Sequence, residues 1–133
     1  MTKRLKVSSP YNGHLISEVD MDDAAQVENA LETAYQLAKD LDKALPAHKR
    51  IEILEKTADL VEARSEEFSH QAAEEGGKPL ADSCVELARA IQGIREAARS
   101  ISQLTGHEVP MNLTPSSMNR MALTTREPIG VVV

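Results

Sequence analysis

The stretch 126-REPIGVVV-133 carries the clearest strand signal in this chain of 133 residues. After Pro128 it becomes a run of isoleucine and valine that only Gly130 interrupts. An apolar run rich in β-branched residues, without polar alternation, is typical of a strand buried on both faces. The stretch therefore predicts a buried strand, and few soluble chains end in one.

Composition limits the class of protein. The chain is 41% hydrophobic and 27% charged, and its length is typical of one domain with its own core. Aromatic residues make up 2% of the chain, so few side chains could stack on nucleic-acid bases. The net charge of −6 disfavours binding to nucleic-acid phosphates. No secretory core or membrane-length apolar stretch is visible, and there is one cysteine. We expect a cytoplasmic protein that binds neither nucleic acid nor membrane.

The amino-terminal stretch 5-LKVSSPYNGHLISEV-19 contains two short alternating runs around Asn12-Gly13. Asn-Gly between such runs is a strong signal for a β-hairpin. The sequence therefore predicts that a small hairpin opens the fold.

Three amphipathic helices are expected between the hairpin and Gly106. The first follows the helix-capping aspartates at 20–23 and covers residues 27–38; the second begins at Pro46 and ends at the glycines 76 and 77; the third runs from Pro79 to about residue 105. In each, apolar residues recur at the spacing of one helix face. Their apolar faces need partners, so the helices must pack on each other, on the hairpin or on something outside the chain.

The composition and spacing of the sequence change after Gly106. Residues 107–128 contain prolines, a Thr-Pro-Ser-Ser turn and alternating apolar positions, which predict a strand, a turn and a second strand. A two-stranded ribbon is marginal by itself, so we expect it to lean on another chain or domain.

Candidates for chemistry are few. Cys84 falls on the apolar face of the third predicted helix, where a buried and inert thiol is expected. The four histidines are far apart in sequence, although His70 and Glu74 are one helical turn apart and could share a cation. The Gly76–Pro79 stretch lacks the spacing of known phosphate-binding loops. The sequence therefore assigns no catalytic, cofactor-binding or metal-ligating residue.

Four motifs occur in the order seen at the amino-terminal end of the aldehyde dehydrogenase superfamily, and together they span essentially the whole chain. The chain resembles that family in the Pro10–Gly13 turn with Ile16 and Val19, in Arg50–Leu54 with Ala58–Leu60, in Gly77–Leu80 with Glu86, Ala90, Ile91 and Arg95, and in Arg126–Val132. It departs where the family often has Trp near the end of the first helix, and at Glu96, where an aromatic residue is common.

The resemblance implies an α/β fold with a Rossmann-type cofactor domain, of which this chain is the amino-terminal segment only. The chain itself is expected to be mostly α-helical, with an N-terminal β-hairpin and a C-terminal β-ribbon. The activity implied is that of an NAD(P)-dependent aldehyde dehydrogenase, an oxidoreductase that oxidises an aldehyde to a carboxylic acid through a cysteine thioester. The cofactor is NAD or NADP, and the catalytic machinery would lie beyond Val133. The 133 residues alone are therefore expected to be inactive and to bind no cofactor.

The same resemblance divides the chain into three parts. Residues 1–106 correspond to the hairpin and helical layer of the cofactor-binding domain, 107–128 to the ribbon of an oligomerisation arm, and 129–133 to the truncated start of the first sheet strand. It implies a homo-oligomer, a dimer or tetramer, formed through the ribbon. It also places Val85 and Arg89 at the mouth of the substrate tunnel.

A different class of function stays open at this point. A non-enzymatic helical interaction module would also have apolar helix faces and a protruding ribbon, which would dock a partner. In such a module the apolar residues 129–133 would be covered by the chain's own helices or by a second copy.

Overall fold

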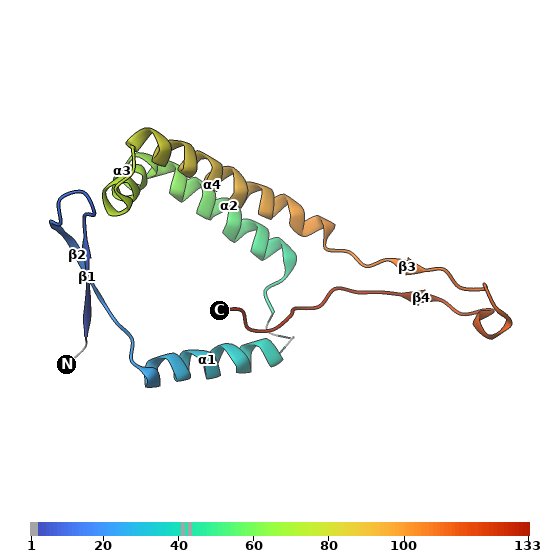
Figure 1. The fold of residues 1–133 in the computed structure, drawn as a ribbon. Helices are drawn as coiled ribbons and strands as arrows, with labels where there is room; N and C mark the ends of the chain where they lie inside the picture. Colours follow the sequence, from blue (N-terminus) through green and yellow to red (C-terminus); the bar gives the residue numbers. More distant parts are fainter. Residues whose placement is uncertain (1–2, 41, 43) are drawn as a thin grey trace.

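The computed structural model describes residues 3–40, 42 and 44–133. The elements in chain order are β1 (Arg4–Ser8), β2 (Leu15–Asp20), α1 (Ala24–Lys39), α2 (Ala47–Ala63), α3 (Ser65–Gly76), α4 (Leu80–Ser100), a 3₁₀ turn (Ile101–Gln103), β3 (Glu108–Val109), a second 3₁₀ turn (Pro115–Ser117) and β4 (Ala122–Leu123). Figure 1 shows an open arrangement: α1 lies apart from the layer of α2, α3 and α4, the turn of the hairpin comes close to α3, and the β3–β4 ribbon projects away from that layer. The chain is mostly helical with two small antiparallel sheets, which confirms the predicted class of secondary structure.

The predicted hairpin is confirmed. Strands β1 and β2 pair antiparallel, and Gly13 takes a left-handed backbone conformation, φ +74°, in the turn between them. The backbone N–H of Gly13 donates to the carbonyl of Ser9 at 2.8 Å, and that of Ser9 donates to the carbonyl of His14 at 2.9 Å. The Asn-Gly signal therefore located the turn correctly.

Helix α1 begins at a capping box. The side chain of Asp23 accepts a hydrogen bond from the backbone N–H of Gln26 at 2.9 Å, and the Gln26 side chain accepts one from the backbone N–H of Asp23. No residue of α1 is buried, and Val27, Leu31 and Tyr35 on its apolar face are 49%, 39% and 50% exposed. The helix predicted for residues 27–38 is confirmed, and its apolar face is about half exposed in the part of the chain that the structure describes.

The core lies between α4 and the pair α2–α3. Its buried apolar residues are Ala58, Ile91 and Ala98. Around them lie half-buried residues of the same three helices: Ile51, Leu54, Val61, Phe68, Leu87 and Ile94. Since so little apolar surface is removed from water, the described residues form one covered layer rather than a closed domain core.

The second predicted helix is wrong in one respect: it is two helices. Helix α2 ends at Ala63 and α3 begins at Ser65, because Arg64 between them has φ −112° and ψ 22°, outside the helical range. The Arg64 guanidinium pairs with Glu67 at 2.6 Å and lies over the Phe68 ring, contacts that hold the corner. In α3 after the break, Ala72 is exposed and its neighbour Ala73 is half-buried.

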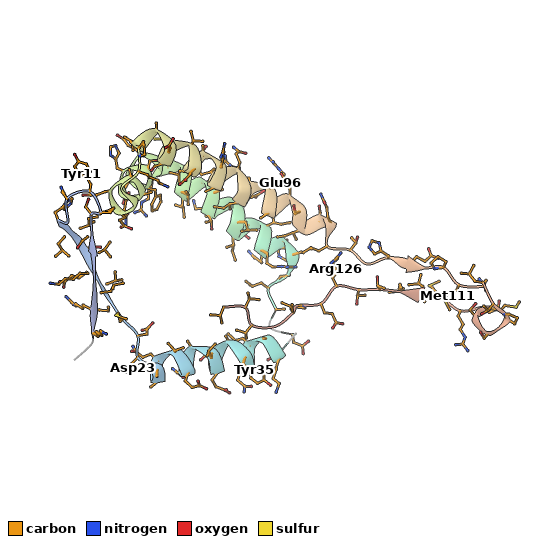
Figure 2. All side chains as sticks on the ribbon, in the orientation of Figure 1. Tyr11, Asp23, Tyr35, Glu96, Met111 and Arg126 are labelled. Atoms are coloured by element: carbon orange, nitrogen blue, oxygen red, sulfur yellow. The ribbon has the colours of Figure 1, made fainter. Side chains whose placement is uncertain are left out.

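The ribbon is confirmed as strand, turn and strand, but its pairing is short. Glu108 pairs with Leu123 and Val109 with Ala122. A bond from the Thr124 backbone N–H to the His107 carbonyl, 2.8 Å, extends the contact toward the helical layer. Figure 2 shows Met111 out on the ribbon and Arg126 at its base, where the chain returns to the layer.

The predicted buried strand at 129–133 does not form in this structure, where these residues are exposed and belong to no sheet. A strand needs a hydrogen-bonding neighbour, and the described residues offer this segment none. Instead Val131, Val132 and Val133 line a shallow hollow with the apolar face of α1. That the segment opens a sheet in a larger fold stays a prediction.

Within the described residues, none of the helices combines the length and the apolar character needed to cross a bilayer.

Candidate functional site

Helix α4 carries core residues on one side and the predicted site residues on the other. Ser83, Ile91 and Ala98 face α2 and α3 and are buried. Val85, 51% exposed, and Arg89 lie one turn apart on the solvent side of the helix. Among the described residues Arg89 has no ion pair, so its guanidinium is available to a ligand or to another part of the protein.

Arg95 anchors the second half of α4 to α2. Its Nη2 atom donates to Glu62 Oε2 at 2.6 Å and to Asp59 Oδ1 at 3.3 Å. The hydrogen bond from Arg95 and its positive charge lower the pKa of Glu62, and the same contacts raise the pKa of Arg95. Both groups therefore stay charged at neutral pH, and the pair fixes the rotation of α4.

The first half of α4 is held at the corner that precedes it. Lys78 pairs with Glu86, one and a half turns into the helix. Gly77 has the left-handed conformation, φ +61°, that ends α3, and a Cβ there would lie 2.6 Å from Pro10 Cγ of the hairpin. The stripe of Val85 and Arg89 thus lies between two anchored points of the helix.

The expectation of a buried Cys84 is wrong: the thiol is exposed. The inward position is taken by its neighbour Ser83, 1% exposed, whose hydroxyl has no hydrogen-bond partner among the described residues. Successive helical residues differ by about 100° in direction, so an apolar stripe alone did not decide which of the two faces α3. A small serine there lets the helices approach closely.

Cys84 opens into a shallow hollow of about 480 Å³ between α3 and α4. The hollow is lined by Glu62, Ser65, Glu66, Ser69, Cys84, Leu87, Ala88, Ile91 and Gln92. A cysteine nucleophile needs a neighbouring base and donors for an oxyanion, and this lining has no histidine, lysine or arginine. The surroundings of Cys84 therefore do not form a thioester site.

The described residues contain no cluster of three or more His, Cys, Asp and Glu side chains arranged to hold a metal ion. His70 and Glu74 do line one hollow, and the structure adds His14 to it. His14 Nε2 lies 2.8 Å from Glu74 Oε1, a contact between hairpin and α3 that sequence reasoning missed. The one feature of the sequence that could have indicated this contact was the position of His14 directly after the Asn-Gly turn.

The Gly76–Gly77 corner does not fit a dinucleotide. The glycine corner at Gly76–Gly77 follows helix α3 rather than a strand, and its Gly77 is packed against Pro10. A cofactor turn needs glycines that let a backbone approach the pyrophosphate at the start of a helix after a strand. The Gly76–Gly77 corner therefore lacks the geometry of a dinucleotide-binding turn.

Comparison with known proteins gives one consistent result. The model of the family described as "Aldehyde dehydrogenase family" matches residues 1–133. A 3-sulfolactaldehyde dehydrogenase of Priestia aryabhattai is 32% identical over 130 residues, 98% of this chain and 27% of that protein. Aspartate-semialdehyde dehydrogenase 1 of Pseudomonas canavaninivorans is 30% identical over 129 residues, 97% of this chain and 27% of that protein.

Solved structures agree. An NADP-dependent glyceraldehyde-3-phosphate dehydrogenase from Bacillus halodurans C-125, complexed with NADP, superposes with a TM-score of 0.86 at 27% identity, over 96% of this chain and 27% of that one. The chain thus spans about a quarter of the length of the relatives that it matches. With the open helical layer and ribbon described above, these matches show that the chain belongs to the aldehyde dehydrogenase family.

Proposed function

We propose that this chain forms the hairpin, helical layer and ribbon of an NAD(P)-dependent aldehyde dehydrogenase. The family match over residues 1–133 is the observation that carries the proposal. The uncovered apolar face of α1 supports it, because a helix whose apolar face is about half exposed needs a covering sheet or helix. In such an enzyme an aldehyde is oxidised to an acid through a cysteine thioester, and the nicotinamide accepts the hydride.

The test is an assay of the protein that carries this chain together with the remainder typical of its family. With NAD or NADP and an aldehyde, reduced cofactor should form in step with carboxylic acid. Removal of the family's nucleophilic cysteine should abolish turnover, whereas Cys84→Ser should leave it unchanged. Loss of turnover in Cys84→Ser alone would contradict the proposal as it stands.

We further propose that Val85 and Arg89 lie at the mouth of the substrate tunnel and that Arg89 favours an anionic aldehyde. The exposed and unpaired guanidinium on an anchored stretch of α4 supports this, because arginine binds carboxylate and related anions through two parallel hydrogen bonds. The names of two relatives, 3-sulfolactaldehyde and aspartate-semialdehyde dehydrogenase, describe aldehydes that carry an acidic group.

Replacing Arg89 by Ala in the complete enzyme should lower kcat/KM for an anionic aldehyde by about tenfold and leave a neutral aldehyde of similar size unaffected. Arg89→Lys should retain part of the preference, since lysine keeps the charge without the two parallel bonds. Arg99→Ala, on the last turn of the same helix, is the matched control. An equal change for both aldehydes would mean that Arg89 is an ordinary surface residue.

The ribbon, residues 107–128, is proposed to join copies of the protein into a dimer or tetramer. Leu113, Met121 and Leu123 are 78%, 85% and 64% exposed on it, more apolar surface than a short two-stranded ribbon keeps in water without a partner. Changing Leu113 and Leu123 together to Ser should lower the native mass measured by light scattering. An unchanged mass would place the interface elsewhere.

The alternative, a non-enzymatic interaction module, rests on the same exposed faces. A protein that turns over no aldehyde with either cofactor, yet binds a macromolecule through α1 and loses that binding in a Leu31→Ser variant, would favour it. Family membership favours the enzyme.

A further inference from the structure

The His14 ring lies between two oxygen atoms that belong to different elements. Nδ1 lies 2.5 Å from Asn12 Oδ1 in the hairpin turn, and Nε2 lies 2.8 Å from Glu74 Oε1 in α3. The Glu74 contact joins residues that are 60 positions apart in sequence. His14 is therefore both part of the turn and its polar link to the helical layer.

Both neighbours accept hydrogen bonds. Asn12 Oδ1 also accepts the backbone N–H of His14 at 3.2 Å, which identifies the atom as the amide oxygen rather than the amide nitrogen. Carboxylate oxygens of Glu74 likewise accept. A neutral imidazole has one N–H and one lone pair, so in this position one ring nitrogen would direct its lone pair at an oxygen.

The doubly protonated ring donates to both oxygens. We propose that His14 is a proton-dependent clasp, which fastens the hairpin turn to α3 when it is protonated and releases it when it is neutral. The proposal concerns this contact alone and does not depend on the catalytic activity of the protein. Histidine is the side chain that ordinarily changes charge between about pH 5 and pH 8, so this is the range in which the clasp is to be tested.

The surroundings of the ring contain two other groups that carry or can gain charge. His70 of α3 and Lys78 of the α3–α4 corner line the same hollow as His14 and Glu74. Lys78 pairs with Glu86, whereas His70 has no hydrogen bond or ion pair among the described residues. Tyr11, in the turn itself, also lines this hollow and is 90% exposed.

Release of the clasp has a local consequence. The turn would then be held against the layer mainly by the contact of Pro10 with Gly77. The hairpin has no other described ion pair to the helices, since Arg4 pairs within it, with Glu18 and Asp20. The amides of residues 9–14 should therefore open more often at higher pH.

Hydrogen exchange followed by mass spectrometry on the intact protein tests this. After correction for the pH dependence of chemical exchange, protection of peptides that cover residues 4–20 should fall about two- to fivefold between about pH 5.5 and about pH 8, the size expected for a partly exposed ion pair. His14→Gln and Glu74→Gln should each remove the pH dependence. Both side chains are about half exposed, so the variants should still fold.

The matched control is His70→Gln, which removes the other histidine of the hollow and should keep the full pH dependence. A wild-type hairpin equally protected at both pH values would overturn the proposal. So would an undiminished fall in His14→Gln, or a fall that disappears in His70→Gln, because the responsible proton would then lie elsewhere.

Discussion

Pro10 of the hairpin turn packs directly on Gly77 at the corner between α3 and α4, where a Cβ would lie 2.6 Å from Pro10 Cγ. This contact and the His14–Glu74 bond join the hairpin to the layer that carries α4. Two glycines stand side by side at the corner, and only the second is required by the geometry.

Gly77→Ala should therefore destabilise the protein. A non-glycine residue in the left-handed conformation costs about 1–2 kcal/mol, and the clash with Pro10 adds to that cost. Chemical denaturation should show the loss. Gly76→Ala is the matched control: its Cβ would meet nothing closer than the Lys78 side chain at 3.8 Å, so the free energy of unfolding should stay equal or rise. Equal losses in both variants would contradict the structure at this corner.

The Arg95–Glu62 pair should make stability depend on acid pH. Because Arg95 lowers the pKa of Glu62 below its ordinary value of 4.5, the pair stabilises the fold above that value and loses its effect as the pH falls through the lowered one. The melting temperature of Glu62→Gln should lie slightly below that of the wild type at neutral pH, and the two should converge in acid. Glu55→Gln, on the same helix without an ion pair, should show no such pattern.

Gly106→Ala should open the base of the ribbon. A Cβ at that position would lie 1.5 Å from the Thr124 carbonyl oxygen, so the two arms must separate and the bond from Thr124 to His107 is lost. If the ribbon joins subunits, native mass spectrometry should show smaller species. Gly93→Ala meets nothing within 4 Å inside α4 and should stabilise by about 0.5–1 kcal/mol. If the oligomer of Gly106→Ala stays intact, the ribbon does not form the interface between subunits.

Ile91 lies in the packed layer of α2, α3 and α4, whereas Leu31 lies on the partly exposed apolar face of α1. Ile91 is 5% exposed, so Ile91→Ala should cost about 2–5 kcal/mol. Leu31 is 39% exposed, and Leu31→Ala in the 133-residue chain should cost much less. In a complete dehydrogenase the same change should become costly, because the apolar face of α1 would be buried. A small effect of Leu31→Ala there would argue against that burial.

The 133-residue chain alone should give no saturable heat signal with NAD in titration calorimetry, since its glycine corner follows a helix rather than a strand and lacks the geometry of a dinucleotide-binding turn. Circular dichroism should first show that the chain is helical. A clear micromolar isotherm would mean that a cofactor site exists within these residues.

Local signals predicted most of the elements. The turn at Asn12-Gly13, the capping box at Asp23 and the glycine stop at Gly77 each specify backbone geometry within a few residues, so the sequence located the hairpin, α1 and the end of α3. The break between α2 and α3 at Arg64 was not predicted, because it contains neither glycine nor proline and depends on contacts with Glu67 and Phe68.

For the candidate site, too, some features followed from the sequence and others only from the tertiary structure. The sequence by itself determined the family, through four motifs in order, and placed Val85 and Arg89 one turn apart on a helix. Only the tertiary structure decided that Ser83 rather than Cys84 faces the core and that His14 meets Glu74. Helical periodicity sets relative directions along one element, whereas packing against another element sets which direction is inward. A contact across 60 positions exists only once the hairpin and α3 lie together.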